Sequence, residues 1–203
     1  MKTFLTALSR FLFGLGRPSK KKNTRLLHKR GETIESFIIR EATAADMSEL
    51  AHIHVITWNA TYPLVLNKPS YRIREYQWRE RFKIRDGSWF CFVVQRPNGE
   101  LIGFAQGNRY TDDLPGFAGQ LNKIYLLGEY QRLGLGRRLF GHIARRFLIQ
   151  GISSMLLFSE PQNPSCKFYE TLGGERILAA NGEFHGAYGW RDLKKLAAIC
   201  PAE

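Results

Sequence analysis

One short stretch of the sequence combines the residue types that bind a phosphate group. Residues 131–138 read Gln-Arg-Leu-Gly-Leu-Gly-Arg-Arg, with two glycines one residue apart. Because glycine has no Cβ, such a stretch can turn tightly and bring bare backbone amides close to a bulky anion. Arg132, Arg137 and Arg138 are expected to add mobile positive charge at the same place. The stretch therefore predicts an anion-binding turn.

A strand is expected before this turn and a helix after it. Residues 124–127 form an apolar run, Ile-Tyr-Leu-Leu. Beyond the turn, apolar side chains recur every four residues, at Leu135, Leu139, Ile143 and Phe147. This step predicts one helical stripe that continues to about Gln150. The first amides of such a helix have no intrahelical partner, and the helix dipole favours phosphate there.

Two familiar nucleotide-binding loops are excluded by spacing. A Walker loop ends in Gly-Lys-Ser/Thr, and a dinucleotide-binding loop needs a third glycine three residues after the second. Residues 131–138 have neither feature. The pattern that remains, Gln/Arg-x-x-Gly-x-Gly between a strand and a helix, resembles the acyl-CoA-binding turn of the GNAT superfamily of N-acyltransferases.

Two further stretches carry the same resemblance. Residues 163–174 read Asn-Pro-Ser-Cys-Lys-Phe-Tyr-Glu-Thr-Leu-Gly-Gly and follow the apolar run 154–158. They are similar to the family's second signature, an Asn before a short helix that bears Phe-Tyr-Glu and ends in Leu-Gly. Residues 39–46, Ile-Arg-Glu-Ala-Thr-Ala-Ala-Asp, resemble the usual opening of such a domain. The resemblance covers about residues 37–193.

The resemblance implies a set of residues that bind acetyl-CoA. Backbone atoms of Tyr125, Leu126 and Leu127 would lie beside the extended pantetheine arm. The pyrophosphate would meet the turn, formed by Gln131, Arg132, Leu133, Gly134, Leu135, Gly136, Arg137 and Arg138. Asn163 would bond the pantetheine, cap the helix that follows it, or do both. Tyr169 would protonate the departing thiolate, or it would only pack in the core; its spacing from Asn163 is one residue shorter than in many relatives.

The base that removes a proton from the acceptor amine is not identified by the resemblance. Many members of the family place a glutamate on or just before the fourth strand, but residues 119–123 here are Gly-Gln-Leu-Asn-Lys. Glu160, which follows the next expected strand, is a candidate catalytic residue. A water relay is an equal alternative, and Glu160 can also be a surface charge without a catalytic role.

The cysteines and the charge distribution constrain the remaining properties. Cys91, Cys166 and Cys200 lie far apart, without the spacing of a metal site or a disulfide framework. This pattern fits a reducing cytoplasm, and we expect a cytoplasmic protein that needs no metal. Residues 1–36 carry nine basic and two acidic residues, so +7 of the net charge of +12 lies there. The remaining excess is small, which argues against specific binding of nucleic acid.

The N-terminal segment is expected to lie outside the catalytic unit. Apolar residues between Phe4 and Leu15 share one helical face, and a basic stretch broken by Pro18 continues to Arg30. The apolar part is too short to span a membrane. A signal peptide is disfavoured by Arg10 and by the absence of a small-residue cleavage site. The segment can pack on its own domain or a partner, or can associate with a membrane surface.

The expected architecture is a single α/β domain with a mixed, splayed central sheet of about seven strands flanked by helices. Residues 1–36 would be a basic amphipathic extension, residues 37–193 the N-acetyltransferase domain, and residues 194–203 a C-terminal tail. The expected function is transfer of an acetyl group from acetyl-CoA directly to a primary amine of a small molecule or a protein. The alternative is a non-catalytic protein that binds acyl-CoA or a partner and keeps only the cofactor turn.

Overall fold

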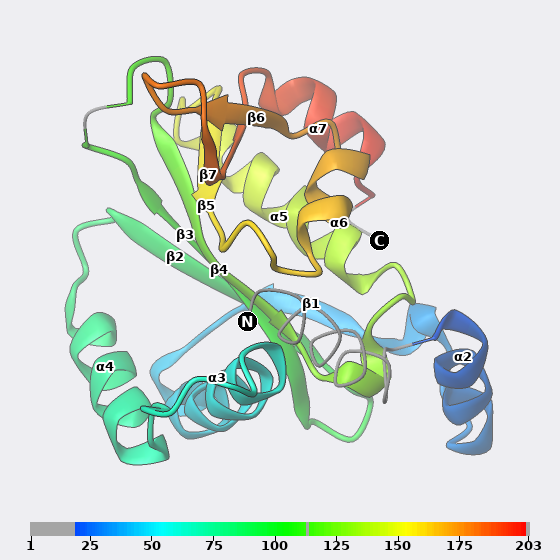
Figure 1. The fold of residues 1–203 in the computed structure, drawn as a ribbon. Helices are drawn as coiled ribbons and strands as arrows, with labels where there is room; N and C mark the ends of the chain where they lie inside the picture. Colours follow the sequence, from blue (N-terminus) through cyan, green and yellow to red (C-terminus); the bar gives the residue numbers. More distant parts are fainter. Residues whose placement is uncertain (1–18, 113, 202–203) are drawn as a thin grey trace, which may run out of the picture.

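A seven-stranded mixed sheet runs through the computed structural model, which describes residues 19–112 and 114–201 (Figure 1). The strand order is β1-β2-β3-β4-β5-β7-β6. The strands are β1 (Ile38–Glu41), β2 (Trp89–Gln95), β3 (Leu101–Arg109), β4 (Gly119–Leu126), β5 (Met155–Phe158), β6 (Glu175–Leu178) and β7 (Phe184–Trp190). Neighbouring strands are antiparallel except for β4 and β5, which are parallel. The predicted mixed α/β sheet is confirmed.

Helices cover both faces of this sheet. Figure 1 shows α3 (Met47–Thr61) and α4 (Tyr71–Lys83) on one face, with α5 (Leu135–Ile149) and α7 (Leu193–Ile199) on the other. The shorter elements are α2 (Lys20–Lys29), α6 (Cys166–Thr171), η1 (Ile34–Ser36), η2 (Ala44–Asp46) and η3 (Gly128–Tyr130). The segment 1–18, which contains the apolar face between Phe4 and Leu15, lies outside the described residues.

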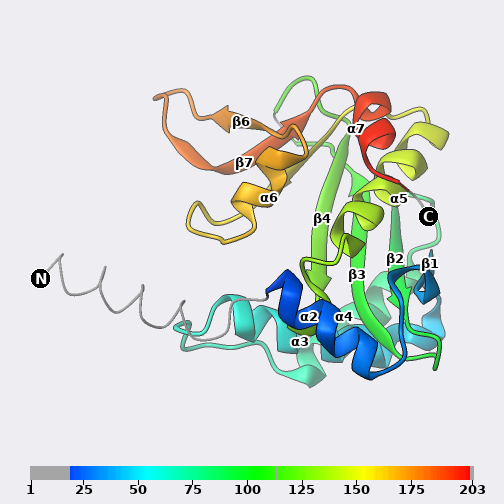
Figure 2. The same ribbon diagram turned by 90° about the vertical axis from the view of Figure 1, so that its right-hand side faces the viewer.

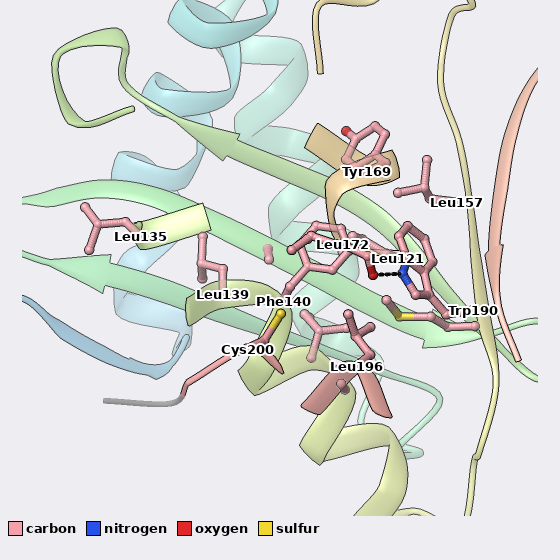
Figure 3. Packing of buried hydrophobic residues seen from close by; sticks show 14 of the residues in the cluster. Leu121, Leu135, Leu139, Phe140, Leu157, Tyr169, Leu172, Trp190, Leu196 and Cys200 are labelled. Carbon is pink, nitrogen blue, oxygen red and sulfur yellow. Dashed lines mark hydrogen bonds between the residues drawn. The ribbon is translucent and has the colours of Figure 1, made fainter. Parts of the chain in front are cut away.

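Helix α5 is the central element of the larger hydrophobic core. The four apolar residues that predicted it, Leu135, Leu139, Ile143 and Phe147, are all fully buried. Figure 3 shows Phe140 of the same helix beside Trp190 of β7, and their ring centroids lie 5.4 Å apart. The Trp190 indole N–H donates to the Leu172 carbonyl at the end of α6, at 2.8 Å. Apolar burial of this extent fixes α5, and with it the turn at its N-terminus.

A short polar network starts α3 where the sequence predicts it. The Thr43 backbone N–H donates to the Asp46 carboxylate at 2.7 Å, which satisfies one of the amides at the helix start. Arg40 on β1 pairs with the same carboxylate at 2.8 Å. The hydrogen bond from Arg40 is the main reason that the pKa of Asp46 is lowered. The network ties the first strand to α3.

Strand β4 leaves its parallel neighbour after only two residues. Gly119 pairs with Met155 and Gln120 pairs with Leu156, and no further pair joins β4 to β5. On its other side β4 stays paired with β3, where Asn122 is an extra residue between two consecutive pairs. A bulge of this kind bends a strand and increases its twist. The two strands consequently diverge, and Figure 2 shows β6, β7 and α6 set apart from the far half of β4.

The described part of the basic N-terminal segment packs on the domain. The Asn23 side-chain amide donates to the carbonyls of Gly128 and Gln131, at 3.0 and 2.8 Å, in the loop that precedes α5. Leu27 is buried in the larger core, and Arg30 pairs with Glu129 at 3.1 Å. Packing on its own domain is one of the alternatives that the sequence left open, and whether residues 1–36 lie outside the catalytic unit stays a prediction. One face of α2 carries the two buried residues, Asn23 and Leu27.

The C-terminal segment also belongs to the fold. Residues 194–203 were expected to form a tail, but Leu193, Leu196 and Cys200 are buried against α5. Asp192 starts α7 by accepting the backbone N–H groups of Lys194 and Lys195. The apolar pattern in this segment spans only a few residues, so the sequence alone did not distinguish a helix from a tail.

Replacement of Asn23 by Ala should destabilise the fold. The substitution leaves two partly buried carbonyls without their donor, and we expect the free energy of unfolding to fall by about 1 to 3 kcal/mol. Lys22→Ala, at an exposed position of the same helix, should change it by less than about 0.5 kcal/mol. Denaturant unfolding of the two variants measures the difference. Equal stability of the two variants would contradict a stabilising role of the Asn23 hydrogen bonds.

Candidate active site

The turn between β4 and α5 has an unusual backbone conformation. Arg132 has a φ of 63°, and among the described residues it is the one non-glycine residue with a positive φ. Gly134 has a φ of 92° and precedes the first residue of α5. A left-handed conformation costs a non-glycine residue roughly 1 kcal/mol or more. Strain of this kind is concentrated at binding and catalytic sites.

Buried neighbours hold the turn in this conformation. Leu133 and Leu135 point into the larger core, and both are buried. The Gln131 side-chain amide donates back to the Leu126 carbonyl at 2.8 Å, across the turn. With the two bonds from Asn23, these contacts fix the path of the backbone between the end of β4 and the start of α5.

The N-terminus of α5 presents free backbone amides. The first N–H groups to bond within this region are those of Arg137 and Arg138, which donate to the Gly134 carbonyl at 2.9 and 3.1 Å. The amides of Leu135 and Gly136 precede them and have no carbonyl within the helix to bond. The helix dipole adds partial positive charge at the same place. The exposed side chain of Arg132 lies on the turn as well. This arrangement suits a phosphate group.

In the structure the side chains of Arg137 and Arg138 are bonded to carbonyls elsewhere in the fold, so their expected contribution of charge at the turn stays a prediction. The Arg138 guanidinium donates to the carbonyls of Ile34 and Phe37, at 3.1 and 3.2 Å. The Arg137 guanidinium donates to the Ile199 carbonyl at 3.2 Å. Both side chains tie α5 to segments that are distant in sequence, a use that no local pattern indicates.

The far half of β4 has an unpaired edge that leads into the turn. Beyond Gln120, no residue of β4 pairs with β5 in the described structure. The backbone of Tyr125, Leu126 and Leu127, which the sequence predicts as a binding edge, lies in or just after this unpaired stretch. An extended ligand with amide groups can bond to such an edge as an added strand does.

Asn163 lies at the start of α6 and has two partners. Its side-chain oxygen accepts the Ser165 backbone N–H at 2.8 Å, in the turn that leads into α6. Its side-chain N–H donates to the Tyr62 hydroxyl at 3.2 Å. Tyr62 follows α3, so this bond joins the two halves of the diverging sheet. The predicted bond from Asn163 to pantetheine stays a prediction.

Tyr169 on α6 is buried among other aromatic side chains. Its ring lies 6.0 Å from that of Phe140, and 6 % of the residue is exposed. Burial raises the pKa of Tyr169, and the neighbouring Cys166, Tyr125 and Tyr62 raise it further. Burial also raises the pKa of Tyr125 to about 12. Tyr169 is therefore protonated at neutral pH, as a proton donor must be.

Glu160 lies in the loop after β5, and its side chain is exposed. Its backbone carbonyl accepts the Asn163 N–H at 2.9 Å, which fixes the loop close to the start of α6. The structure gives the carboxylate no contact that assigns it a role, so its function as a base stays a prediction.

Sequence reasoning missed two residues at this site. Lys123 was noted only because no carboxylate stands there, yet it is half-buried on β4 and its pKa is lowered to about 8, chiefly by burial. His54 on α3 is buried, but its Nδ1 has no hydrogen-bond partner among the described residues. No short motif marks either residue, because Lys123 lies on β4 and His54 lies on α3, and only the fold brings the two together.

Metal-binding clusters and membrane-spanning helices are both absent from the described residues. No group of three or more His, Cys, Asp or Glu residues in this part of the chain is placed to hold a metal ion. In the same residues, no helix is long and apolar enough to cross a membrane.

Comparisons with known proteins give a result that agrees with this geometry. The model of the acetyltransferase (GNAT) family matches residues 50–173. The chain belongs to this acetyltransferase family. It is 34 % identical over 172 residues to the uncharacterized N-acetyltransferase YuaI of Bacillus subtilis, which covers 79 % of this chain and 96 % of that protein. This GNAT protein is thus an acyl-CoA-dependent N-acetyltransferase, with acetyl-CoA as its co-substrate.

More distant relatives show the same fold. The phosphinothricin N-acetyltransferase of Streptomyces viridochromogenes is 28 % identical over 161 residues, which cover 76 % of this chain and 83 % of that protein. The PaiA N-acetyltransferase of Thermoplasma acidophilum, solved in complex with coenzyme A, has a TM-score of 0.57 at 20 % identity. Its structure covers 76 % of this acetyltransferase and 98 % of its own chain. None of these findings supports the alternative of a non-catalytic binding protein.

The residues of the turn and of β4 fit acetyl-CoA. A Cβ at Gly134 would meet no atom within 4 Å, so the turn is open on that side. A Cβ at Gly136 would lie 3.3 Å from the Phe168 ring, which leaves little room for a larger residue. The free amides suit the pyrophosphate, and the unpaired edge of β4 suits the pantetheine amides. The assignment of individual residues to these groups stays a prediction.

The turn is tested by placing the same substitution at both ends of α5. Gly134→Asp sets a negative charge in the expected pyrophosphate site, and we expect acetyl-CoA affinity to fall about tenfold or more. Gly151→Asp is a matched control, because Gly151 also has a positive φ, of 75°, and an open Cβ position. Calorimetric titration with acetyl-CoA measures both. Equal affinity in the two variants would contradict the assignment.

Proposed function

We propose that this enzyme transfers an acetyl group from acetyl-CoA directly to a primary amine, with no covalent enzyme intermediate. The observation that carries the proposal is the unpaired edge of β4, which leads from Tyr125 to the free amides of α5. The edge suits an extended thioester, and the diverging strands leave an approach from the opposite side. One relative, the phosphinothricin N-acetyltransferase, is named for a reaction of the same class.

Tyr169 is proposed to protonate the departing thiolate. Its raised pKa keeps the proton on the phenol at neutral pH, and the packing of Phe140 and Tyr188 around its ring fixes its orientation. A positioned acid of this kind contributes roughly 10² to 10⁴ in rate. The bond between Asn163 and Tyr62 crosses the sheet opening close to the start of α6, which carries Tyr169, and supports this placement.

The acceptor amine must lose a proton before it attacks. An amine with a pKa of about 10.4 is protonated at pH 7, a deficit of about 4.6 kcal/mol that a base or a desolvating site has to offset. We propose Glu160 as this base, with a water relay as the alternative. Glu160 lies on the loop that leads to Asn163, beside the opening between β5 and β4.

Tyr169→Phe should lower kcat by about 10² or more while acetyl-CoA affinity stays unchanged. Tyr188→Phe is the control, because it removes the hydroxyl of the neighbouring ring, which is bonded to Glu170. Because the pKa of Tyr169 is raised above the usual value of about 10, its ionisation should produce no fall in kcat below about pH 10. Steady-state rates of both variants, measured as a function of pH, provide the test. Unchanged kcat in Tyr169→Phe would refute its role as the acid.

Glu160→Gln should slow transfer by about tenfold or more at pH 7, and the loss should shrink as the pH approaches the pKa of the amine. Glu175→Gln, at an exposed position on β6, should leave the rate unchanged. Release of free coenzyme A from a panel of amines measures the rate. An unchanged rate in Glu160→Gln would favour the water relay.

Cys166→Ala should retain transfer, because no acyl group is expected to reside on the protein.

A further inference from the structure

A cavity of about 470 Å³ lies on the sheet face that α3 and α4 cover. Helix α4 forms most of its wall, and side chains of α3, β3 and β4 complete it. The cavity is separate from the turn at α5, which belongs to the other face of the sheet. It shares β4 with the binding edge, because Lys123 lines the cavity only two residues before Tyr125.

Positive charge dominates this cavity. Arg74, Arg81 and Lys123 line it, and no acidic side chain within the described residues forms an ion pair with any of them. Glu80 also lines the cavity, but its carboxylate pairs with Lys83 at 2.6 Å. Three cations in one hollow repel one another, and this repulsion adds to burial in lowering the pKa of Lys123. A ligand that removes the repulsion must be an anion.

Unpaired hydrogen-bond donors gather in the same cavity. Arg74 Nε, Trp78 Nε1 and Gln106 Nε2 are buried and have no partner among the described protein atoms. Trp78 and Gln106 are 3 % and 1 % exposed. A buried polar atom without a partner destabilises the fold, so an array of three is uncommon in a natural protein.

The orientation of Gln106 is determined by its neighbour. Its side-chain oxygen accepts a hydrogen bond from Lys123 at 3.2 Å, and lysine can only donate. The amide nitrogen of Gln106 is therefore free to donate to a ligand. Donors of this number and with this charge match a group that has two or three acceptor oxygens, such as a carboxylate or a phosphonate.

We propose that this cavity binds an oxyanion of the acceptor, so that the substrate is a small amine with a carboxylate or phosphorus oxyanion. The inference rests on the proposed function and narrows its substrate class. Arg74 and Gln106 bind the oxyanion, with Arg81 and Lys123 providing further positive charge. From Lys123 to Leu126 the strand advances roughly 10 Å, so the amine reaches the β4 edge on a short chain. Polyamines and other polycations are disfavoured by the same charges.

Two experiments test the site. The first is a thermal shift with methylphosphonate, which contains the oxyanion and no amine. The Tm of the native protein should rise with concentration, and the rise should be lost in Arg74→Gln and in Arg81→Gln. Arg79→Gln is the control, since Arg79 is exposed on the same helix and does not line the cavity. No rise in the native protein, or an equal rise in all variants, would overturn the site.

The second experiment measures coenzyme A release with amines of two to five methylene groups. Each length is supplied as an amino carboxylate or aminophosphonate, as an amino alcohol and as a diamine. The oxyanion series should have kcat/KM about tenfold or more above the alcohols, and Arg74→Gln should remove this preference through KM. Transfer without a charge preference would overturn the inference but keep the proposed function. An absence of coenzyme A release from every amine would instead contradict the proposed function itself.

Discussion

The early parting of β4 from β5 is the constraint on which the rest of the structure depends. Two backbone pairs hold these strands together, and the bulge at Asn122 then turns β4 away while its pairing with β3 continues. Buried backbone groups need hydrogen-bond partners, so an unpaired strand edge inside a domain indicates a functional role. Here the edge is the surface to which an amide-bearing cofactor arm can bond.

The two sides of this parting are held in place by different interactions. The β4 side is backed by α5, whose apolar face is buried in the larger core and whose N-terminal turn is fixed by Gln131 and by Asn23 from α2. The far side is held by Trp190, which packs on Phe140 and bonds to the end of α6. The bond between Asn163 and Tyr62 joins the two sides across the opening. The site is therefore set by packing on both sides and not by one flexible loop.

The charges of the protein are divided between the two faces of the sheet. On the α5 face, the charged side chains of Arg137 and Arg138 bind carbonyls, and the proposed anion site consists of backbone amides. On the α4 face, Arg74, Arg81 and Lys123 stay without acidic partners. The pKa of His54, lowered to about 3 mainly by burial and further by Arg74 and Lys123, keeps that residue neutral beside them. In our proposals, backbone dipoles bind one anion and side-chain charge binds the other.

The sequence by itself determined the turn and the helix at the centre of the site. The glycine turn and the four-residue step of Leu135, Leu139, Ile143 and Phe147 depend on local periodicity and backbone freedom, which a single stretch contains. Family resemblance added the fold and the co-substrate. The turn at Asn163 before α6 is local in the same way, because an Asx side chain bonds to an amide only two residues away.

Only the tertiary structure decided which partner each charged or polar side chain finds. Arg138 reaches carbonyls about a hundred residues away in sequence, and Asn23 reaches the loop before α5 over a similar separation, so neither contact leaves a local pattern. The cluster of Arg74, Gln106 and Lys123 likewise comes from a helix and two strands. Local sequence sets backbone geometry through forces of short range. The pairing of distant side chains depends on how the faces of the sheet are covered, and that becomes visible only in the folded protein.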